Sequence, residues 1–188
     1  MKIKPAHVFF DGTTGKLEGV HVIETFRKLN DIASIFEDQE AVKRMDLDQP
    51  AYRVEIHEPA PNAEGGLLFG TSYLCPGKVG NEYFMTKGHF HEILNRAEYY
   101  WGISGEGILL TMDQEGKCCA HAIKQGTLHY IPGDIAHRLV NTGNDILTVG
   151  ACWPADSGHD YATIEKTGFS CRVKDVNGKP TVVTSHCK

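Results

Sequence analysis

From Tyr52 onward, apolar and polar residues alternate in short runs separated by glycine, proline, asparagine and aspartate. This period of two predicts β-strands, because successive side chains on a strand point to opposite faces of the sheet. The predicted strands span residues 52–58, 67–75, 97–104, 108–112, 118–124, 127–131, 138–141, 146–152 and 169–176. Strands that follow one another about every ten residues, with hardly any helix between them, indicate an antiparallel barrel or sandwich.

The first 50 residues follow a different pattern. Residues 30–36 and 38–45 each begin with a helix-capping type of residue and space their apolar side chains as a short helix does. Pro50 ends this segment, so we expect two short helices packed on the outside of the barrel. One domain over residues 1–188 is expected, in three parts: N-terminal strands and short helices over 1–50, a barrel over 51–176 and a C-terminal tail over 177–188.

Composition argues against several classes of protein. The chain has 188 residues, of which 41% are apolar, and this is typical of one globular domain. Nineteen basic and 24 acidic residues give a net charge of −5, a poor match to a nucleic-acid backbone. No segment approaches the ~18 apolar residues of a membrane helix, and Asp11 interrupts the N-terminus before a signal-peptide core could form. The six cysteines form no CxxC motif, so we expect reduced thiols in a cytoplasmic protein. From the charge and the lack of a long apolar segment, we expect that it binds neither nucleic acids nor membranes.

The densest group of chemically active side chains lies between residues 86 and 98. His89 and His91 are two positions apart, so on an extended chain both imidazoles project from one face. Such a pair alone carries little weight in a chain with ten histidines. Glu98 and the distant His137 complete a set of three imidazoles and one carboxylate, which suits a divalent first-row metal such as iron, manganese, nickel or zinc. A metal that prefers six ligands would keep two positions open for a substrate.

The spacing around these four residues resembles the two conserved motifs of the cupin superfamily. In this sequence the first motif spans residues 89–105 and the second spans residues 126–141. Asp134 stands where the second motif usually has glycine, which changes a turn and not a ligand. The resemblance implies an all-β fold, the double-stranded β-helix or cupin jelly-roll barrel. It also implies one divalent metal ion per subunit inside the barrel, with Fe²⁺ as the first candidate and with four ligands: His89, His91, Glu98 and His137.

Four blocks of sequence, residues 76–80, 86–91, 96–98 and 154–161, resemble the cupin-type glucose-6-phosphate isomerases first known from archaea. The resemblance covers about residues 8–176, which is most of the chain. It implies a metal-dependent aldose–ketose isomerase that interconverts glucose 6-phosphate and fructose 6-phosphate, a reaction of glycolysis and gluconeogenesis. It also implies a homodimer that pairs through its N-terminal strands, where exposed sheet edges need cover.

The same resemblance implies how the substrate phosphate is held. The Ser72 and Thr86 hydroxyls and the Gly88 backbone match positions that donate hydrogen bonds to it, with serine in place of the more common threonine at position 72. Lys87 is the nearest cation. Trp153 stands where relatives have a tyrosine close to the phosphate, and an indole keeps an N–H donor but lacks the phenolic acceptor. This difference leaves open a related activity, such as isomerisation of mannose 6-phosphate.

Glu98, His159 and Tyr161 are the predicted catalytic residues. His159 and Tyr161 match family positions beside C1, C2 and the ring oxygen, and a histidine that titrates near neutrality suits ring opening. Tyr100 shares strand parity with Glu98, so it should face the same lumen and contact the substrate. Two routes for hydrogen between C1 and C2 stay open: an enediolate with Glu98 as the base, or a direct hydride shift.

Two functions from other classes compete with the isomerase. One is a non-catalytic sugar-sensing cupin, and the presence of Glu98 together with His159 argues against it. The other is an iron-dependent oxygenase, and cupins of that kind lack the segment that carries His159 and Tyr161 here. The isomerase is therefore the leading hypothesis from the sequence.

Overall fold

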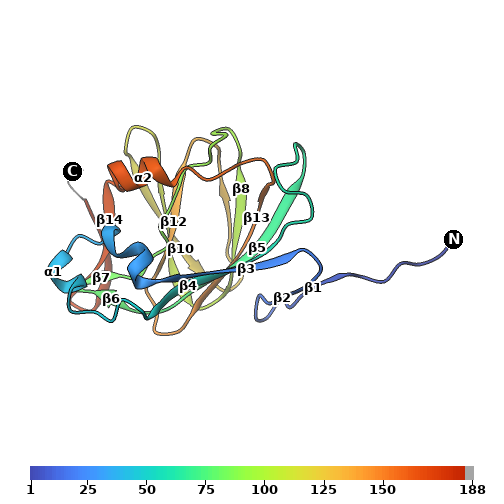
Figure 1. Ribbon diagram of the computed structural model, residues 1–188. Coiled ribbons are helices and arrows are strands. Elements are labelled where there is room, and N and C mark those ends of the chain that lie inside the picture. The colour runs from blue at the N-terminus through green and yellow to red at the C-terminus, as the bar shows by residue number, and fades with distance from the viewer. Residues whose placement is uncertain (185–188) are drawn as a thin grey trace.

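The alternating segments form the strands of a two-sheet barrel in the computed structural model, which describes residues 1–184 (Figure 1). The first sheet has six antiparallel strands in the order β11-β8-β13-β5-β4-β3. These strands are β3 (Val22–Lys28), β4 (Pro50–His57), β5 (Leu67–Leu74), β8 (Glu98–Ser104), β11 (Leu128–Ile131) and β13 (Leu147–Pro154). Ser72 pairs with Val54 on one side and Val149 on the other, so these three side chains share one face of the sheet.

The second sheet has two parts, with strand orders β10-β9-β12 and β15-β14-β7-β6. Its strands are β6 (Lys78–Val79), β7 (Glu82–Tyr83), β9 (Glu106–Met112), β10 (Cys118–Lys124), β12 (Ala136–Asn141), β14 (Cys171–Val176) and β15 (Lys179–Thr184). The segment after β7 joins the two parts, because Met85 bridges Val140 and His89 bridges His137 on β12. This antiparallel architecture confirms the all-β double-stranded β-helix predicted from the sequence.

Two short helical turns follow β3, close to the predicted positions. The first, η1 (Leu29–Ile35), is a 3₁₀ helix, and its buried residues Leu29 and Ile32 are three apart, as the period of such a helix requires. The second, α1 (Gln39–Val42), is a single turn capped by the Asp38 side chain. η1 has 7 residues, the length predicted for 30–36, whereas α1 has 4 residues and is shorter than the helix predicted over 38–45. Apolar contacts with the main core hold both turns.

The N-terminal region takes part in the barrel itself, where the sequence predicts only elements packed outside it. β3 pairs with β4 along its whole length and forms an edge of the six-stranded sheet. β1 (Val8–Phe10) and β2 (Leu17–Gly19) form a separate two-stranded sheet. Most side chains of β3 are exposed, so its sequence has no clean alternation of apolar and polar residues to mark the strand.

β15 lies where the sequence predicts a C-terminal tail. It pairs with β14 across a turn at Asn177 and Gly178, whose φ angles are 55° and 77°. An Asn-Gly pair with two positive φ angles is typical of a tight β-hairpin, so the signal was present in the sequence. Residues 185–188, the remainder of the predicted tail, lie outside the described residues. α2 (Tyr161–Thr167), a further unpredicted element, lies across one end of the barrel (Figure 1).

Inward-facing apolar side chains fill much of the space between the sheets. The largest fully buried ones of the main core include Phe84, Leu109, Ile123, Leu139 and Leu147. Burial of a side chain of this size contributes about 1.5–3 kcal/mol. Among residues 1–184, no helix is both long and apolar enough to cross a membrane.

Glu55 on β4 faces away from the barrel interior and anchors the N-terminal segment. Its buried carboxylate accepts hydrogen bonds from the Leu17 N–H at 2.8 Å and the Tyr73 hydroxyl at 3.1 Å, and it pairs with Arg53. Burial alone would raise the pKa of Glu55, but these partners outweigh burial and lower the pKa. A lowered pKa stabilises the fold above the unfolded-state pKa, and this contribution is lost as the pH falls through the folded-state pKa.

The Glu55→Gln variant is therefore expected to lower the free energy of unfolding by about 2 kcal/mol at pH 7. The difference from the wild-type protein should narrow as the pH falls below about 4, because the wild-type carboxyl group then becomes protonated as well. Urea unfolding of both proteins at pH 7 and at a pH below about 4 measures the loss of stability and its dependence on pH. Glu24→Gln removes an exposed partner of the same Arg53 and serves as the control. A difference that stays constant with pH would contradict the role of the Glu55 charge.

Candidate active site

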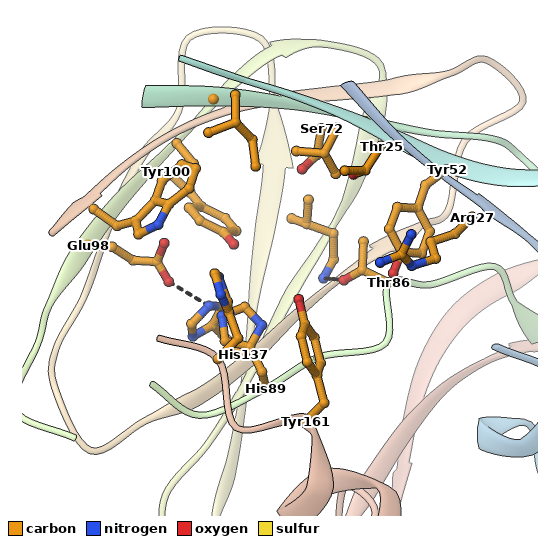
Figure 2. Close-up of a pocket in the computed structure, with 18 residues that line it drawn as sticks. Thr25, Arg27, Tyr52, Ser72, Thr86, His89, Glu98, Tyr100, His137 and Tyr161 are labelled. Atoms are coloured by element: carbon orange, nitrogen blue, oxygen red, sulfur yellow. Dashed lines mark hydrogen bonds and ion pairs between the residues drawn. The ribbon is translucent and has the colours of Figure 1, made fainter. Parts of the chain in front are cut away.

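One cavity lies between the sheets, and strands far apart in the sequence supply its lining (Figure 2). Each strand contributes alternate positions: 52, 54 and 56 from β4, 70 and 72 from β5, 98 and 100 from β8, 137 and 139 from β12, and 151 and 153 from β13. This is the geometry of inward-facing side chains on a pleated sheet. The predicted site residues that line it are Ser72, Thr86, Gly88, His89, Glu98, Tyr100, His137, Trp153, His159 and Tyr161. Lys87 and His91 are the two predicted site residues outside this lining.

Three histidines and one glutamate meet at one end of the cavity. Each of His89, His91, Glu98 and His137 offers one ligand atom, and these atoms all lie within 4.8 Å of one another. His137 Nε2 is 2.5 Å and His91 Nε2 is 3.5 Å from Glu98 Oε1. The backbone bridge between His89 and His137 places their rings 4.5 Å apart between centroids. The fold therefore brings together all four residues that the sequence predicted as metal ligands.

The facing atoms of this group are all acceptors. His91 Nδ1 lies 2.7 Å from the Arg96 carbonyl and His137 Nδ1 lies 3.2 Å from the Ile135 carbonyl. Because a carbonyl only accepts, each Nδ1 carries a proton, and in the neutral imidazole Nε2 then presents a lone pair. Four such atoms are buried, and apart from the ion pairs of Glu98 Oε1 with His137 Nε2 and His91 Nε2 they have no partner among the described residues: His89 Nε2, His91 Nε2, His137 Nε2 and Glu98 Oε1. Buried acceptors that converge on one point fit a divalent cation between them.

The histidines of this group are suited to bind a metal in their neutral form. Burial, together with the neighbouring imidazoles, lowers the pKa of His89 well below its ordinary value. Burial also lowers the pKa of His91. For His137, burial alone would lower the pKa, but the charge of Glu98 outweighs burial and raises it. A metal ion competes with the proton for the same lone pairs, so two of the three imidazoles are already in the binding form near pH 7.

Arg96 fixes the orientation of the His91 ring through Nδ1, the nitrogen that does not face the other ligands. Its carbonyl receives the His91 Nδ1–H bond, and its guanidinium forms a two-pronged ion pair with Asp156, at 3.0 Å from Nε to Oδ1 and 2.6 Å from Nη2 to Oδ2. A bidentate pair of this kind fixes both distance and plane. It ties the loop before β8 to the loop after β13, which carries His159.

His159 reaches the metal-binding group through a short backbone pairing. Asp160 N–H donates to the Phe90 carbonyl at 2.8 Å, so the loop after β13 runs beside the segment that carries His89. The His159 ring lies 4.4 Å from the His89 ring and stacks on Tyr161 with an angle of 11° between the planes. Burial, with a smaller contribution from neighbouring imidazoles, lowers the pKa of His159. His159 is therefore neutral near pH 7 and able to accept a proton.

The other end of the cavity presents hydrogen-bond donors and a cation (Figure 2). The Thr86 hydroxyl accepts a hydrogen bond from the Leu139 N–H at 3.0 Å, which leaves its own proton for another partner. The Tyr52 hydroxyl accepts from the Lys87 N–H, and burial raises the pKa of Tyr52 to about 12, so it stays a phenol. Arg27 on β3 completes this end with an exposed guanidinium. The cavity thus has two chemically different ends.

The sequence pattern did not single out Arg27 or Tyr52. Tyr52 had a usable signal, because it is the first residue of an alternating run whose positions 52, 54 and 56 all line the cavity. Arg27 had none, since β3 itself was not marked as a strand. Lys87, the cation that the sequence did indicate, pairs with Glu165 on α2, and its Nζ lies 5.3 Å from the Tyr161 ring.

Fold and site together define a class of protein. A double-stranded β-helix in which three histidines and one glutamate converge within the lumen is a cupin with a group of side chains that could hold a metal ion. Within that superfamily the chain belongs to the glucose-6-phosphate isomerase family, because the model of that family, described as glucose-6-phosphate isomerase (GPI), matches residues 26–186. This match confirms the family resemblance seen in the sequence.

Similar proteins support the same assignment. A glucose-6-phosphate isomerase of Thermococcus litoralis is 43% identical over 185 residues, which are 97% of this chain and 96% of the relative. A glucose-6-phosphate isomerase of Pyrococcus furiosus is 41% identical and covers 96% of this chain and 95% of its own length. Among solved structures, an oxalate oxidase in complex with the substrate analogue glycolate covers 79% of this chain and 58% of its own, at 11% identity and a TM-score of 0.47. That structural likeness is too distant to bear on function.

Proposed function

We propose that this chain is an isomerase that interconverts glucose 6-phosphate and fructose 6-phosphate. The observation that carries the proposal is one cavity with a buried metal-binding group at one end and a cation with hydroxyl donors at the other. A sugar phosphate has the same two ends, a polyhydroxyl carbonyl compound and a dianion. The family and its curated relatives, which are named glucose-6-phosphate isomerase, support this reading.

The phosphate binds at the Arg27 end. The guanidinium of Arg27 supplies charge-assisted hydrogen bonds, and the Ser72 and Thr86 hydroxyls and the Gly88 N–H supply neutral ones. The Tyr52 hydroxyl donates a hydrogen bond to the phosphate from the same side. Binding at this end uses atoms of the substrate that do not react, and it fixes the distance from the phosphate to the carbons that do.

His159 and Tyr161 act on the sugar ring. A neutral His159 takes the proton from the anomeric hydroxyl and returns one to the ring oxygen, which opens the ring. Tyr161 stacks on His159 and keeps its plane fixed. Burial raises the pKa of Tyr161, so its hydroxyl remains a hydrogen-bond donor to the substrate at neutral pH.

Hydrogen transfer between C1 and C2 takes place beside Glu98. His89, His91, Glu98 and His137 would hold a divalent metal, which would supply Lewis-acid chemistry for this step. In an enediolate route Glu98 carries the proton from one carbon to the other, whereas in a hydride shift it acts only as a ligand. Turnover in deuterated solvent separates the routes, because retention of the C2 hydrogen at C1 counts against the enediolate when the base exchanges its proton.

A coupled assay on metal-stripped protein tests the proposed function. The protein is reloaded in turn with iron, manganese, nickel, zinc and cobalt, and turnover of fructose 6-phosphate is measured with each. The expected result is no turnover without metal and turnover with at least one of the five. No turnover with any of them, in protein shown to have bound the metal, would remove the proposal.

Trp153 leaves open a second candidate, isomerisation of mannose 6-phosphate. Its ring lines the cavity, and its Nε1–H is buried with no partner among the described residues. A sugar oxygen can accept from this donor, and glucose 6-phosphate and mannose 6-phosphate both offer one, so only a measurement separates them. The ratio of kcat/KM for mannose 6-phosphate and glucose 6-phosphate is the test, with Trp153→Tyr as the comparison. A ratio that does not change in Trp153→Tyr excludes a role of the indole in selectivity.

Loss of the Arg27 charge is expected to weaken substrate binding. The Arg27→Met variant should raise KM for fructose 6-phosphate by about tenfold or more, because a charge-assisted hydrogen bond is worth ~1.5–3 kcal/mol, and should leave kcat nearly unchanged. Steady-state kinetics on the metal-loaded enzyme measure both constants. Lys28→Met, at the next position of the same strand, removes a cation that pairs with Asp48 instead and is the control. A KM equal to that of the wild-type enzyme would exclude Arg27 from the phosphate site.

Three finer properties belong to the same proposal: Fe²⁺ as the native metal, a homodimer and a cytoplasmic location. The edge strand β3 exposes Phe26 and Ile23, and Phe9 is exposed on the N-terminal hairpin, which supports pairing through this region. The cysteines among residues 1–184 are all free, which fits a reducing compartment. Sedimentation analysis and metal analysis of protein purified without oxygen test the first two properties, and cell fractionation tests the third.

A further inference from the structure

Arg138 is a buried cation directly behind the cavity wall. It follows His137 on β12 and points to the opposite face of the strand, where only 4% of it is exposed. Its Nη2 donates to the Lys87 carbonyl at 2.6 Å, and its Nη1 lies 3.0 Å from Met85 Sδ. The guanidinium carbon lies 4.0 Å from the centre of the Phe169 ring. These contacts hold the side chain in one place.

Arg138 forms no ion pair with an aspartate or glutamate among residues 1–184. Glu82, the acidic residue that most affects it, pairs with Arg172 at 2.6 Å instead. The Arg138 Nε–H is buried and makes no hydrogen bond to a described residue. A buried cation that no carboxylate neutralises is costly for the fold, so its presence points to an anion that binds nearby.

The bond to the Lys87 carbonyl has a consequence for the cavity side of the same peptide unit. The chain has no cis peptide bond among its described residues, so the Lys87 C=O and the Gly88 N–H point in opposite directions. Arg138 holds the carbonyl on the outer side of the strand. The Gly88 N–H is thereby directed away from Arg138, toward the cavity that Gly88 lines.

Gly88 itself is fitted to Arg138. Its φ of 78° is in the left-handed region, and a Cβ at this position would lie 2.9 Å from Arg138 Nε and 2.9 Å from the Phe169 ring. Any other residue would push the guanidinium away from the peptide. The glycine, the arginine and the ring therefore form one packed unit behind the donor end of the cavity.

We propose that Arg138 is a positioning residue for the substrate phosphate, which aims the Gly88 N–H into the cavity and places a full positive charge one peptide layer behind the bound dianion. This rests on the proposed function only for the identity of the substrate. The chemistry that Arg138 recognises is a phosphate group, held through the backbone of Gly88 and without direct contact. A fixed charge in this position strengthens every donor in front of it.

The test compares Arg138→Met with the wild-type protein, both metal-loaded. Calorimetry with inorganic phosphate gives Kd, and the isomerase assay gives KM and kcat for fructose 6-phosphate. Expected are rises of about tenfold or more in Kd and KM, with the metal content unchanged and a kcat within threefold of the wild-type value. Arg53→Met is the matched control, because Arg53 also lies over a ring, at 3.6 Å from the centre of Tyr73, but faces away from the cavity.

The outcomes separate the two proposals. If wild-type protein binds inorganic phosphate but turns over no sugar phosphate, the proposed function fails. The role of Arg138 is then decided by the Kd for phosphate of Arg138→Met compared with that of the wild-type protein. Unchanged Kd and KM in folded Arg138→Met overturn the role of Arg138, as does a loss confined to thermal stability, which Arg53→Met is also expected to show. Should Arg138→Met not fold, Arg138→Gln, which keeps a donor for the Lys87 carbonyl but has no charge, decides: a Kd at least threefold higher supports the role, and a wild-type Kd overturns it.

Discussion

Replacement of His137 by alanine is expected to abolish both metal binding and turnover. His137 is 1% exposed, its Nε2 lies 2.5 Å from Glu98 Oε1, and its backbone bridges His89, so it contacts two of the other three ligands. Loss of a direct ligand should exceed the ~10–100-fold loss of metal affinity that follows loss of a residue supporting one. Since Glu98 would then be a buried carboxylate without its nearest partner, the remaining three residues are not expected to rearrange into an equivalent site.

Metal content after dialysis and kcat/KM for fructose 6-phosphate measure the effect of His137→Ala. His129→Ala is the matched control, because His129 is a partly buried histidine on β11 that lies outside the cavity, beside His121. The control should keep the metal and the rate. Retention of metal at the wild-type ratio in His137→Ala would contradict the assignment of the four ligands.

Replacement of His159 by alanine should have the opposite signature: full metal content with a loss of kcat of about 10²–10⁴-fold, the range for a general acid–base group. His159 lies 4.4 Å from the His89 ring, yet its loop reaches the site independently through Asp160 and Phe90. Removal of the imidazole therefore leaves the metal ligands and their supports in place. The comparison of His137→Ala and His159→Ala separates metal binding from proton transfer.

The measurement for His159→Ala is kcat at saturating metal, with the metal-to-protein ratio determined on the same sample. His159→Gln keeps a polar side chain of similar reach that does not titrate, and it should be as slow as the alanine variant. If either variant ran at the wild-type rate, the role of His159 in ring opening would be wrong.

The metal-binding group could be located from the sequence because its signal is local. For two histidines at alternate positions and a glutamate at the start of a strand, the period of two predicts the face of the sheet to which each side chain points. The distant His137 needed the spacing of a known motif, since no local pattern tells which late strand lies beside His89. The structure supplies that pairing as a backbone bridge.

Arg27 and the N-terminal strand could not be found in this way. β3 lies at the edge of its sheet with most side chains exposed, so the rule that one face is apolar does not apply to it. Its partner β4 begins 22 residues after β3 ends, across η1 and α1, which also obscures the pairing. The cation therefore reaches the cavity by tertiary contacts that no local period encodes.

The C-terminal hairpin and Arg138 were missed for different reasons. Asn177 and Gly178 form a turn that the sequence indicates, and β15 follows it where the sequence predicts a tail. Arg138 follows His137 in the motif, but a charged residue in a fully buried strand contradicts the usual rule for such positions. Violations of that kind mark places where the chain gives up stability for function.

The four ligands are divided between the sheets, with Glu98 at the start of β8 in the first sheet and His137 on β12 in the second. A metal ion bound by residues of both sheets would cross-link them at one end of the barrel, and unfolding would have to release the ion. Binding to the native state alone stabilises by RT ln(1 + [L]/Kd), which is about 2.7 kcal/mol at a free concentration of 100 Kd. The persistence of this protein in a cell would then depend on the local supply of metal as much as its rate does.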